Sequence, residues 1–325
     1  MLSKRSVLLA DGAMGTTLFE LGLEGGKCPE LLNVEQPELI KEVHRRYVEA
    51  GSDIVLTNSF GGTSQRLAFH GLEGRVKELN TRAVEILREV VDESGRQVVV
   101  AGDVGPTGEL FEPVGPLTIS QGTEMFAEQM TALVDAGADV LWVETFSSLE
   151  ELEAATEAAS RIALPLVTTL SFDSKGRTMM GVTPEQLAEW WKKRDHKPFA
   201  IGANCGIGPA DAVGAVFDIA SIAPGVVMVT KPNAGMPVFE AGELRYPLGP
   251  EDVGDYVELA LRAGARILGM CCGSTPAHIA AIRRIVDAGL PSSPLERSEI
   301  EERLGAHRAA GSLGEPPRRT RRREL

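Results

Sequence analysis

Three of the four cysteines have a spacing that could bring their sulfur atoms onto one metal ion. Cys205 is followed by a glycine, and the adjacent pair Cys271 and Cys272 is also followed by one, which suits tight turns. Thiolate sulfur selects zinc over magnesium or calcium, and three protein ligands leave one tetrahedral position open for a substrate. The alternative is that they are buried apolar cysteines. Cys28, in an early loop, is interpreted as a bystander.

Acidic and amide side chains could bind an amino-acid substrate beside these thiols. Asp11 and Glu144 each follow a short apolar run. A carboxylate in such a place is costly unless something neutralises it, which a substrate ammonium group would do. Loop amides or an arginine are the alternative partners. Asn58, Asn204 and Asn233 also follow apolar runs and could fix a substrate carboxylate, although asparagine is a common turn residue as well.

Eight apolar runs and eight helical segments would have to position these residues. The runs are rich in Val, Ile and Leu, as strands buried on both faces require, and lie at residues 7–9, 54–56, 98–101, 140–143, 166–170, 200–201, 226–229 and 267–270. Helical periodicity covers roughly residues 39–49, 75–91, 122–136, 149–161, 184–192, 209–222, 250–263 and 276–286. Thr183 and Gln186 predict a capping box, and Thr275-Pro276 predicts a second helix start.

This alternation predicts a parallel (β/α)8 TIM barrel over residues 1–290. A doubly wound open sheet is the alternative, but the sequence has neither a dinucleotide fingerprint after the first strand nor a Walker phosphate loop. In a barrel, the chemistry lies at the carboxyl ends of the strands. Cys205 follows the sixth predicted strand and Cys271 and Cys272 follow the eighth, so their side chains should face one pocket.

Composition narrows the class of protein. The chain has 325 residues, 43% of them hydrophobic and 24% charged, and a formal net charge of −13. It is therefore not broadly disordered, and its acidity argues against nucleic acid as the main partner. No apolar run reaches the roughly 18 residues of a membrane span, and the start of the chain does not resemble a secretory signal. Four cysteines are too few for a disulfide scaffold, so we expect a reducing, cytoplasmic location.

The last 35 residues differ in composition from the rest. From residue 291 the chain becomes rich in Pro, Ser, Glu and Arg, and it ends in a strongly basic run after Pro316-Pro317. We expect residues 291–325 to form a charged, disordered tail. A contact with RNA, an acidic partner or a membrane surface is the alternative role for its basic end.

The strand-end residues together resemble the homocysteine S-methyltransferase family over about residues 7–288. The resemblance is carried, in order, by residues 11–16, 56–61, 105–108, 144–146, 202–205, 232–235 and 269–273. It implies a zinc-dependent TIM barrel that methylates homocysteine to methionine. It further implies that Cys205, Cys271 and Cys272 bind zinc, and that Asp11 and Glu144 lie near the amino group of homocysteine.

The resemblance leaves several methyl donors open. Residues 171–183 are similar to bacterial betaine–homocysteine methyltransferases and to the homocysteine module of cobalamin-dependent methionine synthase, which Tyr246-Pro247-Leu248 also resembles. We predict glycine betaine, with S-methylmethionine or methylcobalamin on a partner corrinoid protein as alternatives. Thr145 stands where animal betaine enzymes carry a tyrosine. Two other classes are a non-catalytic zinc-binding barrel acting in a complex and a phosphate-binding barrel enzyme.

Overall fold

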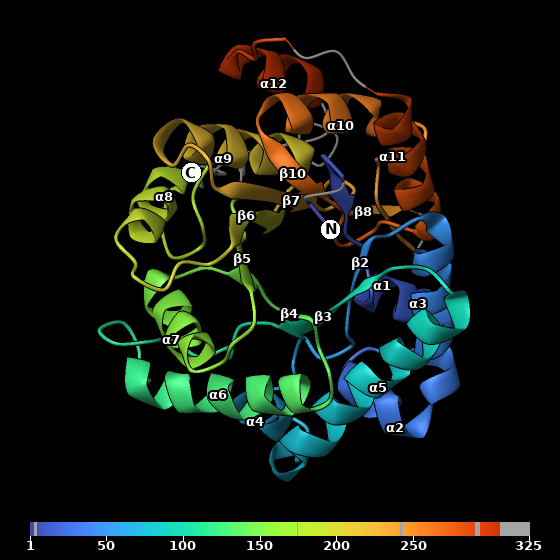
Figure 1. Ribbon diagram of the computed structural model, residues 1–325, viewed down its shortest axis with the longest axis vertical. Coiled ribbons are helices and arrows are strands. Elements are labelled where there is room, and N and C mark those ends of the chain that lie inside the picture. Colours follow the sequence, from blue (N-terminus) through green and yellow to red (C-terminus); the bar gives the residue numbers. More distant parts are fainter. Residues whose placement is uncertain (3–4, 174, 241–242, 290–292, 306–325) are drawn as a thin grey trace, which may run out of the picture.

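A ring of parallel strands enclosed by helices forms the body of the molecule (Figure 1). The computed structural model describes residues 1–2, 5–173, 175–240, 243–289 and 293–305. The ring strands are β1 (Leu8–Leu9), β2 (Ile54–Leu56), β3 (Val99–Val104), β4 (Val140–Phe146), β5 (Leu166–Leu170), β6 (Ala200–Cys205), β7 (Val227–Pro232) and β10 (Ala265–Leu268). Each predicted strand is present, and four of them, β3, β4, β6 and β7, continue further toward the carboxyl end than the apolar runs indicated.

The strands close into a barrel. The eight-stranded sheet has the order β1-β10-β7-β6-β5-β4-β3-β2, and every pair in it is parallel. A parallel bridge between Ala10 and Ile54 joins its two ends. The predicted TIM barrel is therefore confirmed, and the open doubly wound sheet is excluded by this closure.

Helices with one apolar face cover the outside of the barrel. The longer ones are α3 (Pro37–Ala50), α5 (Val76–Ser94), α6 (Ile119–Asp135), α7 (Leu149–Ser160), α8 (Pro184–Lys192), α9 (Pro209–Ile222), α10 (Val253–Arg262) and α11 (Pro276–Ala288). The capping box predicted between Thr183 and Gln186 is present at α8, and Thr275 makes another with His278 at α11. The cap at α11 begins that helix directly after the loop that carries Cys271 and Cys272.

Short elements fill the loops between strands and helices. They are α1 (Gly15–Glu20), η1 (Pro29–Leu31), α2 (Leu32–Glu35), α4 (Ser64–Ala68), η2 (Glu73–Arg75) and the antiparallel pair β8 (Val238–Glu240) and β9 (Glu243–Arg245). Within the described parts of the chain, none of the helices combines the length and apolarity that crossing a bilayer requires.

The interior of the barrel is packed by alternate strand residues, as a TIM barrel requires. Leu8, Leu56, Val167 and Ile267 belong to this cluster, together with Trp142, which is fully buried. The indole Nε1 of Trp142 donates to Oε2 of Glu144 at 3.1 Å. The barrel core therefore also supports a side chain at the carboxyl end of β4.

Part of the expected tail is ordered. Helix α12 (Arg297–Leu304) packs against α9 and α10 (Figure 1). Its Ile300 and Leu304 lie one turn apart on one face and are buried, and Arg303 forms ion pairs with Asp255 and Glu258. The expectation of disorder was wrong for this stretch. Most of its residues are charged or polar, so the two apolar residues one helical turn apart, Ile300 and Leu304, did not stand out as a buried helix face. The basic run near the end of the chain lies outside the described residues.

Candidate metal centre and acceptor pocket

The three predicted cysteines meet at the carboxyl end of the barrel. Cys205 ends β6, and Cys271 and Cys272 follow β10, with only β7 between the two strands in the sheet. The three sulfur atoms all lie within 4.8 Å of one another. In the part of the chain that the structure describes, this is the one group of three or more Cys, His, Asp or Glu with such spacing. The sequence prediction that these sulfurs converge is confirmed.

The end of β7 holds the two thiol-bearing segments together. Asn233 donates from Nδ2 to the Gly206 carbonyl at 2.6 Å and accepts the Cys272 N–H at Oδ1, at 3.0 Å. The backbone N–H of Cys271 donates to the Pro232 carbonyl at 2.7 Å. Asn233 therefore links the two cysteine-bearing segments, and the contact with substrate that the sequence suggested for it remains a prediction.

The backbone around Cys205 is strained. Its φ is 58°, a left-handed conformation that non-glycine residues rarely adopt, and strain of this kind gathers at functional sites. Gly206 follows with φ 68°, and a Cβ there would lie 2.3 Å from the Phe172 carbonyl oxygen, so only glycine fits. The reversal aims the Cys205 sulfur at the other two.

The donor set suits a soft divalent cation. Hydrogen bonds from the Cys271 and Cys272 thiols lower the pKa of Cys205, and the bond to Cys205 raises the pKa of the other two. Zinc would neutralise three thiolates together and leave a fourth position for a ligand.

One cavity of about 260 Å³ joins the cysteines to a cluster of charged side chains. Cys205, Cys271 and Cys272 line it, together with Asp11, Asp103, Glu144 and Lys231, and it is partly walled by the loops after β1 and β2. A thiol-bearing amino acid could therefore reach the sulfurs and the acids at once. The sequence expectation that Asp11 and Glu144 flank the same pocket as the thiols agrees with this arrangement.

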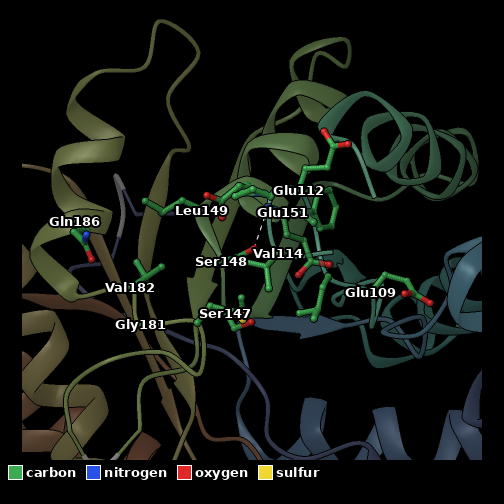
Figure 2. A pocket seen from close by; sticks show the side chains of 15 residues that line it. Glu109, Glu112, Val114, Ser147, Ser148, Leu149, Glu151, Gly181, Val182 and Gln186 are labelled. Carbon is green, nitrogen blue, oxygen red and sulfur yellow. Dashed lines mark hydrogen bonds between the residues drawn. The ribbon is translucent and has the colours of Figure 1, made fainter. Parts of the chain in front are cut away.

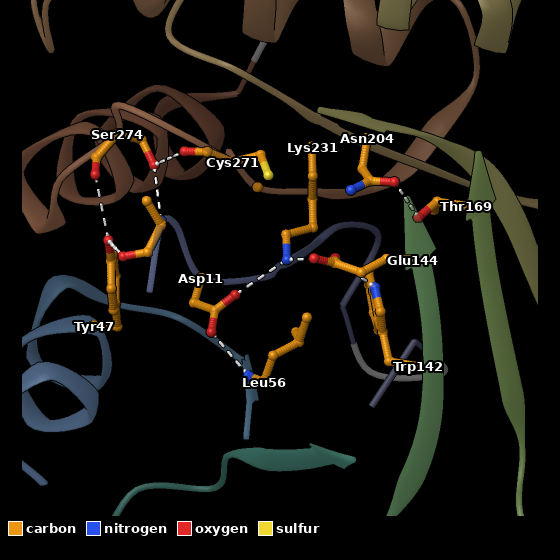
Figure 3. A network of polar contacts seen from close by, with 12 residues as sticks. Asp11, Tyr47, Leu56, Trp142, Glu144, Thr169, Asn204, Lys231, Cys271 and Ser274 are labelled. Atoms are coloured by element: carbon orange, nitrogen blue, oxygen red, sulfur yellow. Dashed lines mark hydrogen bonds and ion pairs between the residues drawn. The ribbon is translucent and has the colours of Figure 1, made fainter. Parts of the chain in front are cut away.

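Lys231 bridges the two predicted acids (Figure 3). Its Nζ lies 3.3 Å from Oδ1 of Asp11 and 3.2 Å from Oε2 of Glu144. Asp11 also accepts the Leu56 N–H at 2.8 Å. Burial raises the pKa of Asp11 to about 6, against the opposing effect of Lys231. Burial alone would lower the pKa of Lys231, but Glu144 and Asp11 raise it, so the lysine stays charged.

Lys231 was missed in the sequence, although it stands at the end of a predicted strand beside Pro232. Long cationic side chains usually reach solvent, so a lysine at this place does not by itself indicate a buried site residue. The structure buries it almost completely, with 2% of the side chain exposed. The signal available in the sequence was that Lys231 is a charged residue at the end of an otherwise apolar strand.

The side-chain amides of the other two predicted asparagines, Asn204 and Asn58, form hydrogen bonds with other residues of the protein. Asn204 accepts from the Thr145 N–H and the Thr169 hydroxyl and donates to the Thr145 hydroxyl, which holds Thr145 at its left-handed φ of 68°. Asn58 lies on the cavity wall, but its Nδ2 donates to the Pro29 carbonyl at 2.8 Å. These contacts shape the cavity, and contacts of either amide with substrate remain predictions.

Cys28 lies apart from the other thiols. Its sulfur donates to Oε2 of Glu30 at 3.2 Å, and burial raises its pKa to about 12. Glu30 in turn accepts the Gly61 N–H. A thiol that is protonated and partnered in this way fits the bystander interpretation.

A second cavity of about 330 Å³ lies between loops that follow β3, β4 and β5 (Figure 2). It shares no lining residue with the cysteine cavity. Glu109, Glu112 and Glu151 line it, and Glu151 accepts from the N–H and the hydroxyl of Thr107. Its lining contains neither thiol nor lysine, so it offers no counterpart to the chemistry of the first cavity.

Comparisons with known proteins point to one family. A family model described as homocysteine S-methyltransferase matches residues 8–286. The methionine synthases of Mycobacterium tuberculosis and Mycobacterium leprae are each 32% identical, over 88% of this chain and 25% of their own length. The chain thus spans about a quarter of these curated relatives. The metallated form of the homocysteine methyltransferase MmuM from Escherichia coli is 28% identical, with a TM-score of 0.74 over 87% of this chain and 97% of that one.

Proposed function

Because the chain belongs to the homocysteine S-methyltransferase family, we propose that it converts homocysteine to methionine at a zinc ion held by Cys205, Cys271 and Cys272, with glycine betaine as the methyl donor. The observation that carries this proposal is the single cavity lined by both the three converging sulfurs and the carboxylates. Such a cavity matches the two ends of homocysteine, a thiol and an ammonium group.

The three cysteine ligands suggest how the thiol of homocysteine, the methyl acceptor, would be activated. A free thiol with a pKa of about 8.5 is a poor nucleophile at neutral pH. Zinc, when bound, would supply a positive centre directly at the acceptor sulfur, which would keep that sulfur deprotonated. Asn233 and the strained Cys205 backbone hold the three ligands in place. The described strand ends carry no histidine, and a metal-held thiolate needs no general base.

The transfer itself is a displacement at a methyl carbon. A lone pair of the acceptor sulfur forms the new S–CH3 bond, while the C–N bond of betaine breaks and leaves its electron pair on the nitrogen of dimethylglycine. The thiol proton has by then left to solvent. The protein contributes chiefly alignment, which can supply a large part of the rate enhancement.

The charge of the cavity supports a cationic donor. Phe60 is the one aromatic residue among those lining it, so an aromatic cage for a quaternary ammonium is not formed by these residues. Four carboxylates, those of Asp11, Glu30, Asp103 and Glu144, line the cavity against one lysine and give it a negative field. This field favours an onium compound such as betaine over a neutral donor.

A donor screen tests the proposal. The zinc-loaded protein is incubated with homocysteine and either betaine, S-methylmethionine or methylcobalamin, and methionine is quantified, with Cys205→Ser as the control. Betaine-dependent methionine that Cys205→Ser abolishes is the expected result. If methionine forms only with S-methylmethionine or only with methylcobalamin, that compound is the methyl donor and betaine is not. If zinc binds but no donor yields methionine, the result favours a non-catalytic barrel.

A further inference from the structure

A β-bulge near the carboxyl end of β4 brings two consecutive side chains to the cysteine cavity. Between two paired positions, β4 has two residues, Glu144 and Thr145, where β5 has only Thr169. Side chains of a regular strand alternate between its faces, yet Glu144 and Thr145 both line the cavity. The next residue, Phe146, is fully buried outside the barrel, with its ring centroid 5.5 Å from that of Phe126 in α6. Bulges often redirect side chains in this way beside active sites.

The bulge strains the backbone at Thr145. Its φ of 68° lies in the left-handed region, where the Cβ atom crowds the following carbonyl oxygen. Such a conformation is rare for a β-branched residue, and it persists only where the surrounding structure imposes it. Contacts from elsewhere in the protein must therefore hold Thr145.

Asn204 of β6 supplies these contacts. Its Oδ1 accepts the Thr145 N–H at 2.8 Å, and its Nδ2 donates to the Thr145 hydroxyl at 2.7 Å. The same Oδ1 accepts the hydroxyl of Thr169, the residue opposite the bulge, at 2.7 Å (Figure 3). Asn204 is 1% exposed and is not among the residues that line the cavity. Its amide is thus engaged with the bulge and can affect the cavity through Thr145.

The direction of Glu144 is linked to the bulge. The Glu144 carboxylate lies 3.2 Å from Nζ of Lys231 and accepts from the Trp142 indole. Without the extra residue, regular alternation after Glu144 would direct Thr145 away from the cavity and Phe146 into it. The bulge therefore preserves both the place of the acid and the open space beside it.

We propose that Asn204 is a positioning residue for the methyl transfer: it holds the left-handed bulge at Thr145, which keeps Glu144 and the cavity in the shape that homocysteine binding requires. This inference deepens the proposed function and rests on its homocysteine acceptor. It differs from the direct substrate contact that the sequence suggested for Asn204.

A double-mutant cycle tests this role, because glycine adopts the left-handed conformation without the steric cost that threonine has. Homocysteine binding to the zinc-loaded full chain is measured by calorimetry for the wild type, Asn204→Leu, Thr145→Gly and the double variant. Asn204→Leu alone should weaken binding about 10- to 100-fold, the range for residues that orient binding groups. In the Thr145→Gly background its effect should be at least about 5-fold smaller, because the left-handed conformation no longer has to be imposed.

Asn58→Leu is the matched control. It replaces another buried strand-end amide, whose bonds go to Pro29 and Asn33 rather than to the bulge. Its effect on homocysteine binding should be the same in both backgrounds. Equal effects of Asn204→Leu in the two backgrounds would overturn the proposal.

Thermal unfolding of the same proteins separates positioning from a purely structural role. A structural role would couple Asn204 and Thr145 in the Tm values but leave homocysteine binding by the folded protein unchanged, which would also overturn the proposal. Asn204→Ser, a smaller substitution, takes the place of Asn204→Leu if the leucine variant does not fold. Failure of the proposed function is distinguishable: a wild type that binds homocysteine but forms no methionine with any donor still gives the binding cycle. A wild type that does not bind homocysteine overturns both the acceptor and this inference.

Discussion

Oδ1 of Asn233 accepts the backbone N–H of Cys272 at 3.0 Å, while its Nδ2 reaches the carbonyl of Gly206, next to Cys205. One side chain at the end of β7 thus links the Cys205 segment of β6 to the two cysteines that follow β10. The arrangement of the three proposed zinc ligands therefore depends on a side-chain amide that makes both of these bonds at once.

Loss of this link should weaken the metal site without removing a ligand. Asn233→Ala is expected to lower zinc affinity about 10- to 100-fold, as for other residues that orient ligands. Competition with a chromophoric chelator measures the affinity. Asn58→Ala removes an amide from the same face of the barrel and should leave zinc affinity unchanged, since Asn58 bonds Pro29 and Asn33 instead. Equal losses in the two variants would contradict the assigned role.

Removal of Lys231 should destabilise the fold. Lys231→Met leaves Asp11 and Glu144 buried without their shared cation, which costs about 3–5 kcal/mol of unfolding free energy at pH 7. The loss should be smaller at pH 5, because the Asp11 pKa of about 6 already allows protonation there. Urea unfolding at both pH values measures it.

Lys41→Met provides the comparison, because its partners Glu38 and Glu89 are largely exposed. We expect that variant to lose much less stability than Lys231→Met, because ion pairs of this exposed kind contribute little. A Lys231→Met protein as stable as Lys41→Met at pH 7 would show that the bridge contributes little to the folded state.

His44 makes a separate pH-dependent contribution. It is fully buried in α3, and both ring nitrogens lack a partner among the described residues. Burial lowers its pKa from 6.5 to about 3. Between these values the unfolded chain binds a proton that the folded protein does not, so stability falls as pH decreases below 6.5. At pH 5 the loss is about 2 kcal/mol.

The variant His44→Leu should abolish this pH-dependent loss. Unfolding free energies at pH 8 and pH 5 are compared for the wild type, for His44→Leu and for His70→Gln, whose side chain is exposed. The difference between the two pH values should shrink by about 2 kcal/mol in His44→Leu alone. An unchanged difference would mean that the His44 ring is protonated in the folded protein.

The barrel was predictable because its strands are buried on both faces and therefore stand out as apolar runs between helical segments. The convergence of Cys205 with Cys271 and Cys272 followed from counting those strands. The start and end of α8 and α9 also matched the predicted ranges, since proline at the first position marks both starts.

The features of the site that the sequence did not predict depend on the direction in which individual side chains point. Lys231 and Asp103 stand at strand ends like the predicted acids, yet only the packing shows that one fills the space between Asp11 and Glu144 and the other is left unpaired. The left-handed backbone of Cys205 is likewise imposed by tertiary contacts. Helix α12 was hidden by a local composition typical of a tail.

Zinc-edge X-ray absorption on the full chain, with and without homocysteine, tests the central claim most directly. The account predicts a zinc shell with three sulfur ligands from Cys205, Cys271 and Cys272, and a fourth sulfur when homocysteine is added. A shell dominated by nitrogen and oxygen, or a sulfur count that homocysteine leaves unchanged, would contradict it.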